Sequence, residues 1–199
     1  MSKKANEIRT KKVKLITFWS LIGLATLAFI TVLVILFIET RPYESYSDIR
    51  KDNLTLIRDQ MFSQAGETYY VYVYDSSNTN ELSAEKALEL EPVVFNYFNF
   101  VKQNSRKSGV VKIYGLDVND FENRSCVKNT DSYTRVSRFD NFAVKASSLP
   151  LLLEIVNGVV EYPYATISQI QEELQSTMDT FRTSIRNPIL IVPKKEFTF

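Results

Sequence analysis

A run of 24 consecutive uncharged residues, from Leu15 to Ile38, limits the fold of this chain more than any other sequence feature. As an α-helix rising about 1.5 Å per residue, the run is about 36 Å long, enough to cross a hydrocarbon core about 30 Å thick. Its serine and threonine hydroxyls can bond to carbonyls of the preceding turn, so they need no water inside a bilayer. The run therefore predicts a transmembrane helix over 15–38, through which the chain contacts lipid.

The residues on either side of this run indicate its direction across the membrane. Residues 1–14 form a basic tail with six lysine or arginine residues and a single acid, Glu7, whereas 39–41 carry almost no net charge. Positive charge is retained on the cytoplasmic side of a membrane. We expect the amino terminus inside the cell, an exit linker over 39–44, and the rest of the chain outside the cytoplasmic (plasma) membrane.

A cleaved signal peptide is the alternative interpretation of the apolar run. Its hydrophobic region would hold about 7 to 15 residues and end at a site of small residues. The run is longer than that, and Phe37 to Thr40 do not form such a site. The sequence thus favours an anchor that stays attached.

Composition restricts the chemistry of the outer part. The whole chain has 24 basic and 23 acidic residues, and without residues 1–14 the balance becomes mildly acidic, which does not favour nucleic acid as a partner. The chain has no histidine and one cysteine, Cys126. These counts exclude an internal disulfide, a thiolate metal cage and histidine-dependent hydrolysis. We expect no metal and no cofactor.

Hydrophobic periodicity outlines the first half of the outer domain. The patterns first predict a helix from Ser45 or Ser47 to about Met61 and a strand over Tyr69–Tyr74. A polar loop over 75–80 follows. The patterns then predict a helix from a Ser83 cap to about Val101, which contains Pro92, and a strand over Gly109–Val118. A strand, a crossover helix and a strand form a βαβ unit. We therefore expect the two strands to be parallel.

The second half begins with an ambiguous segment and continues with sharper signals. Residues 121–148 predict a short helix or irregular structure. Two apolar runs, Leu151–Val156 and Val159–Tyr162, flank Asn157-Gly158, which predicts a hairpin with positive φ at both turn residues. Thr166 and Gln169 form a capping box that opens a helix to about Arg182, and residues 183–199 form a tail without a clear assignment.

The order of these elements resembles the thioredoxin fold over residues 45–182. Leu149-Pro150 stands in the place of the family's cis-proline dipeptide, Asn157-Gly158 in its hairpin, and Pro92 in the place of the kinking proline of its second helix. The resemblance implies an α/β domain in which helices flank a mixed central sheet, and a cis Leu149–Pro150 bond.

The family's redox chemistry needs a Cys-x-x-Cys motif at the start of that second helix. Counting back from Pro92 places the motif at Ala84–Ala87, and counting forward from the first strand places it near Asn78–Glu81. Neither window contains cysteine, so dithiol chemistry is not expected. The groove implied by the resemblance remains, with these candidate partner-binding residues: Asp75, Ser76, Ser77, Asn78, Leu149 and Pro150.

We therefore expect a single-pass membrane protein that presents a redox-inactive thioredoxin-like domain outside the membrane, where it binds or assembles exported or membrane proteins. Extended polypeptide would pair with backbone groups beside the proline. Two alternatives stay open. Cys126, between Arg124 and Lys128, is a candidate monothiol redox group. In the second alternative, the chain is a structural subunit of a membrane complex, and helix 15–38 is its interface. An oligomer is compatible with each of these hypotheses.

Overall fold

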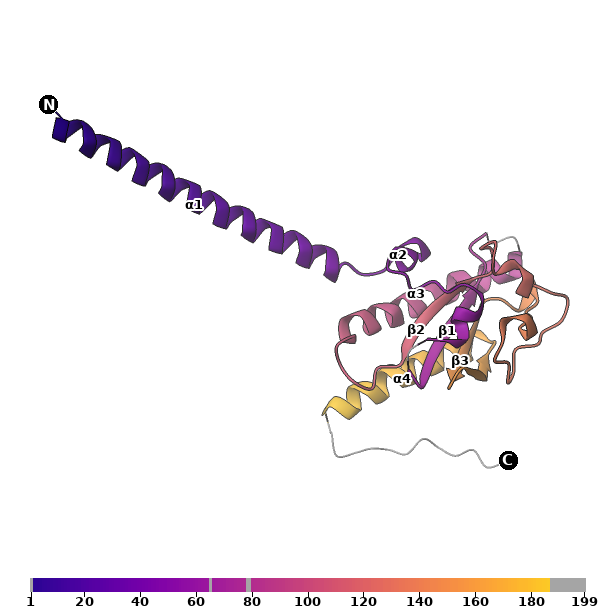
Figure 1. Cartoon of the computed structure of the whole chain (residues 1–199). Coiled ribbons are helices and arrows are strands. Elements are labelled where there is room, and N and C mark those ends of the chain that lie inside the picture. Colours follow the sequence, from indigo (N-terminus) through magenta and orange to yellow (C-terminus); the bar gives the residue numbers. More distant parts are fainter. Residues whose placement is uncertain (1, 65, 78–79, 187–199) are drawn as a thin grey trace. The chain divides into compact units, whose positions relative to one another are not determined.

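The computed structural model of this protein describes residues 2–64, 66–77 and 80–186 (Figure 1). The chain divides into two compact units, Met1–Pro42 and Tyr43–Phe199. Helix α1 (Ser2–Thr40) forms the first unit, and its stretch Val13–Phe37 is exposed, apolar and long enough to cross a membrane. The hydroxyls of Thr17, Thr26 and Thr31 each donate to the carbonyl four residues earlier at 2.9 Å, as predicted. A single membrane span and a signal sequence share these features.

The second unit is an α/β domain with a mixed four-strand sheet. Its strands are β1 (Thr68–Tyr74), β2 (Lys112–Asp117), β3 (Leu151–Val156) and β4 (Val159–Tyr164), in the order β2-β1-β3-β4. β1 and β2 are parallel, as the sequence predicted, and the pairs β1–β3 and β3–β4 are antiparallel. Helix α3 (Glu81–Asn104) makes the crossover between the parallel strands, and α4 (Ile167–Arg186) packs beside it.

Separate hydrophobic clusters cover the two faces of the sheet. Alternate residues of β1 point to opposite faces. Tyr70, Tyr72 and Tyr74 pack with side chains of α3 and α4, whereas Tyr69, Val71 and Val73 pack with irregular segments, most of them between β2 and β3. The central strand is therefore buried on both faces, which explains its unbroken run of valine and tyrosine.

The predicted helix over 45–61 is wrong. Helix α2 (Tyr46–Lys51) ends after one and a half turns, Asn53 has a φ of 56°, and a 3-10 helix, η1 (Arg58–Phe62), follows later. Between them the chain pairs with the outer edge of β2, where Gly115 donates to the Leu54 carbonyl at 2.8 Å and accepts from the Leu56 amide at 2.7 Å. This pairing needs extended backbone, which overrides the helical spacing of the apolar residues.

Helix α3 contains Pro92, as predicted, but begins two residues before the predicted cap. Asn80 is the N-cap, and its side-chain oxygen accepts from the Ser83 amide at 3.1 Å. Ser83 is buried in the first turn. An asparagine satisfies the same free amides as a serine, so the two residues compete for this position.

The ambiguous segment between β2 and β3 is irregular, with three single-turn 3-10 helices: η2 (Arg124–Cys126), η3 (Phe139–Asn141) and η4 (Ala146–Ser148). Isolated bridges join Val127 to Val144 and Ser132 to Ala143. These contacts fold the segment onto one face of the sheet without regular secondary structure.

The carboxyl-terminal elements agree with the sequence analysis. Asn157 and Gly158 have φ values of 50° and 76° in the hairpin turn. The Thr166 hydroxyl accepts from the Gln169 amide at 3.3 Å, and the Gln169 side chain accepts from the Thr166 amide at 3.2 Å, which completes the capping box. Helix α4 continues to Arg186, past the predicted end. The predicted tail over 187–199 lies outside the described residues.

Gly109 and Gly158 both have a positive φ, and comparing a substitution at each distinguishes the cost of backbone strain from the cost of a steric clash. A Cβ at Gly158 would lie 2.8 Å from the Phe62 carbonyl oxygen, whereas a Cβ at Gly109, with a φ of 83°, would meet nothing within 4 Å among the described residues. We expect Gly109→Ala to lower the free energy of unfolding by about 1–2 kcal/mol. Gly158→Ala should cost about 1–3 kcal/mol more, because it adds the clash.

Urea unfolding of the full chain in mild detergent, followed by circular dichroism, measures both values. Gly109→Ala serves as the matched control for the unfavourable φ. Equal costs for the two variants would show that the hairpin turn moves away from Phe62 without penalty.

Candidate functional site

The predicted groove residues lie at the end of the sheet where β1 and β2 finish. The parallel register places Tyr74 opposite Asp117, so the residues that follow both strands emerge side by side. Strand β3 runs antiparallel to β1 with Leu151 opposite Val73, which brings Leu149 and Pro150 to the same end. The Leu149–Pro150 peptide bond is cis, as predicted.

Two neighbouring depressions, which share Val127 and Ala146 in their lining, lie at this end and together form what we call the strand-end groove. The first, of about 260 Å³, is lined by Asp75, Ser77, Val118, Asn119, Arg124, Val127, Ala146 and Leu149. The second, of about 340 Å³, shares Val127 and Ala146 and adds Asn80, Lys128, Asn129, Lys145 and Ser147.

Three of the six predicted groove residues line this groove: Asp75, Ser77 and Leu149. Ser76 and Pro150 lie beside it without contributing to the lining, and Asn78 lies outside the described residues. Sequence reasoning missed the wall formed by residues 124–129 and 145–147, because an irregular segment carries no periodic signal. The only available indication was the position of this segment directly before Leu149-Pro150.

The loop after β1 is fixed by two carboxylates. Asp117 is buried, and one of its oxygens accepts from the amides of Ser76 at 3.2 Å and Asn119 at 3.0 Å. Its other oxygen forms an ion pair with Arg50 at 3.0 Å. Asp75 accepts from the Ser77 amide at 2.9 Å and from the Ser77 hydroxyl. Hydrogen bonds to a carboxylate are stronger than neutral ones, so this wall of the groove is held firmly.

The loop before Pro150 is held on one side by Asp131. The carboxylate of Asp131 accepts from the Lys145 amide at 2.8 Å and from the Ser148 hydroxyl at 2.9 Å. The Leu149 amide donates to the Ala146 carbonyl over a long distance of 3.4 Å. Leu149 is 1% exposed, backbone and side chain together. The loop therefore presents little of this residue to a partner in the groove.

Helix α3 holds the same loop from the other side. The Ser83 hydroxyl donates to the Ala146 carbonyl, and the Lys86 ammonium donates to the carbonyls of Ser148 at 3.1 Å and Ala165 at 2.6 Å. Burial lowers the pKa of Lys86 to about 8. Lys86 lies in Ala84–Ala87, one of the two windows expected for a Cys-x-x-Cys motif, and it joins α3 to two loops.

The charge of the groove is predominantly positive. Among the described lining residues, Arg124, Lys128 and Lys145 carry positive charge and Asp75 is the one acid. Arg124 is oriented by its own bond to the Asn119 carbonyl at 3.0 Å. The surface therefore favours anionic or carbonyl-rich partner groups, although the outer domain as a whole is mildly acidic.

Cys126 does not face outward, which disfavours the alternative of a monothiol redox group. Its side chain is 1% exposed and belongs to the hydrophobic cluster beneath the irregular segment. Burial raises the pKa of this thiol to about 12. Arg124 and Lys128 flank it in sequence but do not overcome the cost of placing a thiolate in an apolar environment.

The described residues contain no group of three histidine, cysteine or acidic side chains arranged to hold a metal ion. A scan against models of known protein families, a search of curated proteins and a search of solved structures each found no match to this chain.

The burial of Cys126 predicts slow alkylation. The rise of its pKa from 9.0 to about 12 lowers the thiolate fraction at pH 8 about a thousandfold. We expect iodoacetamide to modify the folded chain slower than the guanidinium-unfolded chain by at least this factor, as measured by mass spectrometry. The unfolded chain is the control. Equal rates would show an accessible thiol and would restore the monothiol redox hypothesis.

The environment of Lys86 predicts a dependence of stability on pH. Its pKa is 10.5 in an exposed lysine and about 8 in the folded chain, so between these pH values the unfolded state binds more protons. The contribution of Lys86 to the free energy of unfolding therefore rises as pH increases from about 8 to 10.5, and is lost as pH falls through 8.

Urea unfolding of wild type and Lys86→Met between pH 7 and 10.5, an interval that contains both pKa values, tests whether the free energy of unfolding rises with pH. Wild type should gain stability relative to Lys86→Met over this interval. Lys86→Arg, which stays charged throughout, should show no such gain. A constant difference between wild type and Lys86→Met would mean that the ammonium is stabilised as well in the fold as in water.

Proposed function

We propose that this chain is a single-pass membrane protein whose outer domain has a thioredoxin-like fold without redox activity and binds extended segments of exported or membrane proteins in the strand-end groove. The anchor would be α1, whose exposed apolar stretch Val13–Phe37 follows a basic tail. The domain would then lie outside the cytoplasmic membrane.

The topology supports the thioredoxin-like assignment. The parallel β1–β2 pair joined by α3, the β3–β4 hairpin followed by α4, and the mixed sheet that these strands form agree with what the resemblance implies. Pro92 within α3 and the cis bond before β3 agree with it as well.

The observation that carries the binding function is a polar-walled groove at the end of the sheet, where the loops after β1 and before Pro150 meet. Hydrogen bonds that Asp117 and Asp131 accept and that Lys86 donates hold its walls before any partner arrives. Preorganisation of this kind lowers the entropy that binding has to overcome. With no thiol in the groove, recognition rather than electron transfer is the chemistry that remains.

The two sheet edges offer less room for strand addition than the groove. Residues 54–56 pair with Gly115 on the outer edge of β2. On the outer edge of β4, the Arg135 amide donates to Val160 at 2.8 Å and the Val160 amide donates to Val136 at 2.9 Å. Covered edges do not accept a foreign strand. Among the described residues, the strand-end groove therefore offers a partner more room than either edge.

The charge of the groove narrows the class of partner. Three cationic side chains and one carboxylate favour an extended segment that carries acidic residues. The hydrophobic lining from Val118, Val127 and Ala146 adds contact area for alternate apolar side chains.

Filling the groove should abolish peptide binding. The probe is a fluorescent peptide of alternating valine and glutamate, with a valine–lysine peptide for comparison, and binding to the full chain in neutral detergent is measured by anisotropy. Ser77 is exposed, and Ser77→Trp should weaken binding of the acidic peptide about tenfold or more, because the indole occupies the first depression. Ser176→Trp, at an exposed position on α4, is the matched control and should bind as wild type.

Reversing the charge should change the preference. In the double variant Lys128→Glu/Lys145→Glu we expect the lysine peptide to bind more tightly than the glutamate peptide. Circular dichroism confirms that each variant is folded. Binding that is equal in wild type, Ser77→Trp and the charge-reversed variant would contradict the groove as the binding site.

A further inference from the structure

The turn from Asp117 to Asp120 forms part of one wall of the strand-end groove and has an acidic side chain at each end. The residues between them, Val118 and Asn119, line the first depression. The Asp120 amide donates to the Asp117 carbonyl at 3.2 Å and closes the turn. The shape of this wall therefore depends on how the two carboxylates are held.

Arg50 holds both carboxylates with a single nitrogen. Its Nη2 atom lies 3.0 Å from an oxygen of Asp117 and 2.8 Å from an oxygen of Asp120. Arg50 belongs to α2, 67 residues before Asp117, so these contacts join that short helix to the turn. A guanidinium is planar and keeps its charge at any ordinary pH, so it fixes the separation of the two oxygens that it contacts.

Asp117 is the buried partner in this arrangement. Its side chain is 2% exposed, and its second oxygen accepts from the amides of Ser76 at 3.2 Å and Asn119 at 3.0 Å. Removing one partner of a buried ion pair leaves an uncompensated charge in the protein. Without Arg50 the carboxylate would turn toward water, and both amides would lose their acceptor.

Asn119 connects the turn to a cation of the groove. The Arg124 side chain donates from Nε to the Asn119 carbonyl at 3.0 Å and from Nη2 to the Asn119 side-chain oxygen at 3.4 Å. The Arg124 amide also donates to the Asp120 carbonyl at 3.1 Å. The position of the Arg124 guanidinium therefore follows the position of the turn.

Arg50 is not among the described residues that line the strand-end groove. It lines a separate depression of about 340 Å³, together with Asp120 and Glu122. An effect of Arg50 on a partner in the groove would therefore pass through the turn rather than through direct contact.

We infer that Arg50 is a positioning residue for the strand-end groove. It holds the turn 117–120, and with it Asn119 and Arg124, in the arrangement that binds an extended acidic segment. This inference rests on the proposed binding function. It makes partner binding dependent on α2, although α2 lies outside the groove.

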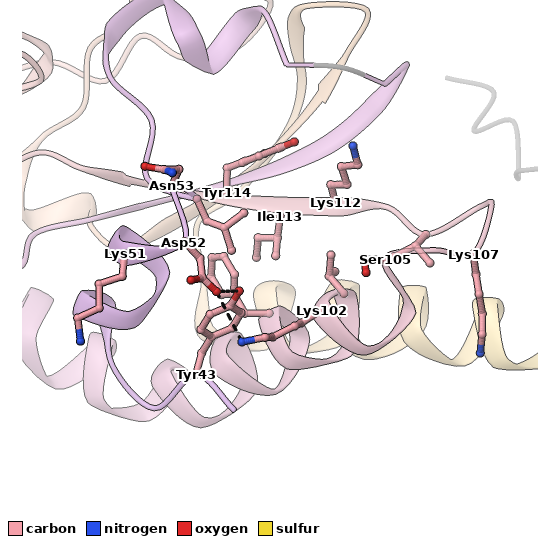
Figure 2. A pocket seen from close by; sticks show the side chains of 14 residues that line it. Tyr43, Lys51, Asp52, Asn53, Lys102, Ser105, Lys107, Lys112, Ile113 and Tyr114 are labelled. Carbon is pink, nitrogen blue, oxygen red and sulfur yellow. Dashed lines mark hydrogen bonds and ion pairs between the residues drawn. The ribbon is translucent and has the colours of Figure 1, made fainter. Parts of the chain in front are cut away.

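Peptide binding to charge-matched variants tests this role. With the valine–glutamate peptide in the anisotropy assay, Arg50→Gln should weaken binding to the full chain about tenfold. Lys51→Gln, at the next position of α2, removes the same charge and should bind as wild type. Lys51 is 74% exposed, and Figure 2 shows it in the lining of a pocket of about 620 Å³ at the start of β2, away from the strand-end groove.

A second substitution distinguishes positioning from a direct contact between Arg50 and the peptide. In Arg50→Gln/Asp117→Asn the buried charge is removed, and the asparagine oxygen still accepts from the amides of Ser76 and Asn119. We expect this double variant to bind within about threefold of wild type. Asp117→Asn alone keeps Arg50 paired with Asp120 and should also bind close to wild type.

Hydrogen exchange supplies a readout that a general loss of stability would not reproduce. In Arg50→Gln we expect segments 75–77 and 117–124 to exchange at least about tenfold faster, because the amides around Asp117 lose their acceptor. The hairpin 151–164 should exchange as in wild type. Mass spectrometry of peptic fragments from the full chain in neutral detergent measures both regions.

The outcomes that overturn the inference are specific. They are wild-type binding by Arg50→Gln, a double variant as weak as Arg50→Gln, or an equal rise in exchange across all segments. Should Arg50→Gln fail to fold, the double variant carries the test, because it contains no uncompensated buried charge: binding near wild type supports the inference, and weak binding overturns it. Absence of peptide binding in wild type would instead overturn the proposed function, and local hydrogen exchange would still show whether Arg50 holds the turn.

Discussion

The parallel pairing of β1 with β2 is the constraint on which the rest of the domain depends. Parallel neighbours cannot be joined by a tight turn, so the chain crosses over through α3, which covers one face of the sheet. Parallel strands in turn require cover on both faces, and the irregular segment between β2 and β3 supplies it on the other. The same pairing places both carboxyl ends together, where the strand-end groove opens, and the start of β2 at the opposite end of the sheet.

Local signals in the sequence predicted much of this fold, because the interactions behind them span only a few residues. Asn157-Gly158 and the Thr166–Gln169 box are confirmed by positive φ values and by reciprocal hydrogen bonds. The strand Tyr69–Tyr74 is confirmed within one residue. The cis Leu149–Pro150 bond was predicted from a family resemblance that links distant parts of the chain.

The errors arose where a distant partner outweighs a local pattern. Leu54 was assigned to one helical face with Ile49, yet Leu54 and its neighbour Leu56 pair with Gly115 far along the chain. Cys126 has basic neighbours, yet long-range packing buries it. Residues 124–129 and 145–147 could not be placed in the groove wall because bonds such as that between the Asp131 carboxylate and the Lys145 amide leave no periodic trace.

The double hydrogen bond between Asn99 and the backbone of Tyr43 also determines how mechanical load passes through the domain. Tension applied to the chain at Tyr43 would pass directly into α3, at the end of the sheet where β2 begins. A load held in the strand-end groove would pull from the other end. The two forces would then act along β1 and β2, so their ladder would be loaded in shear, with many backbone bonds resisting together rather than opening one at a time. The paired strands are thus arranged to resist stretching along their length.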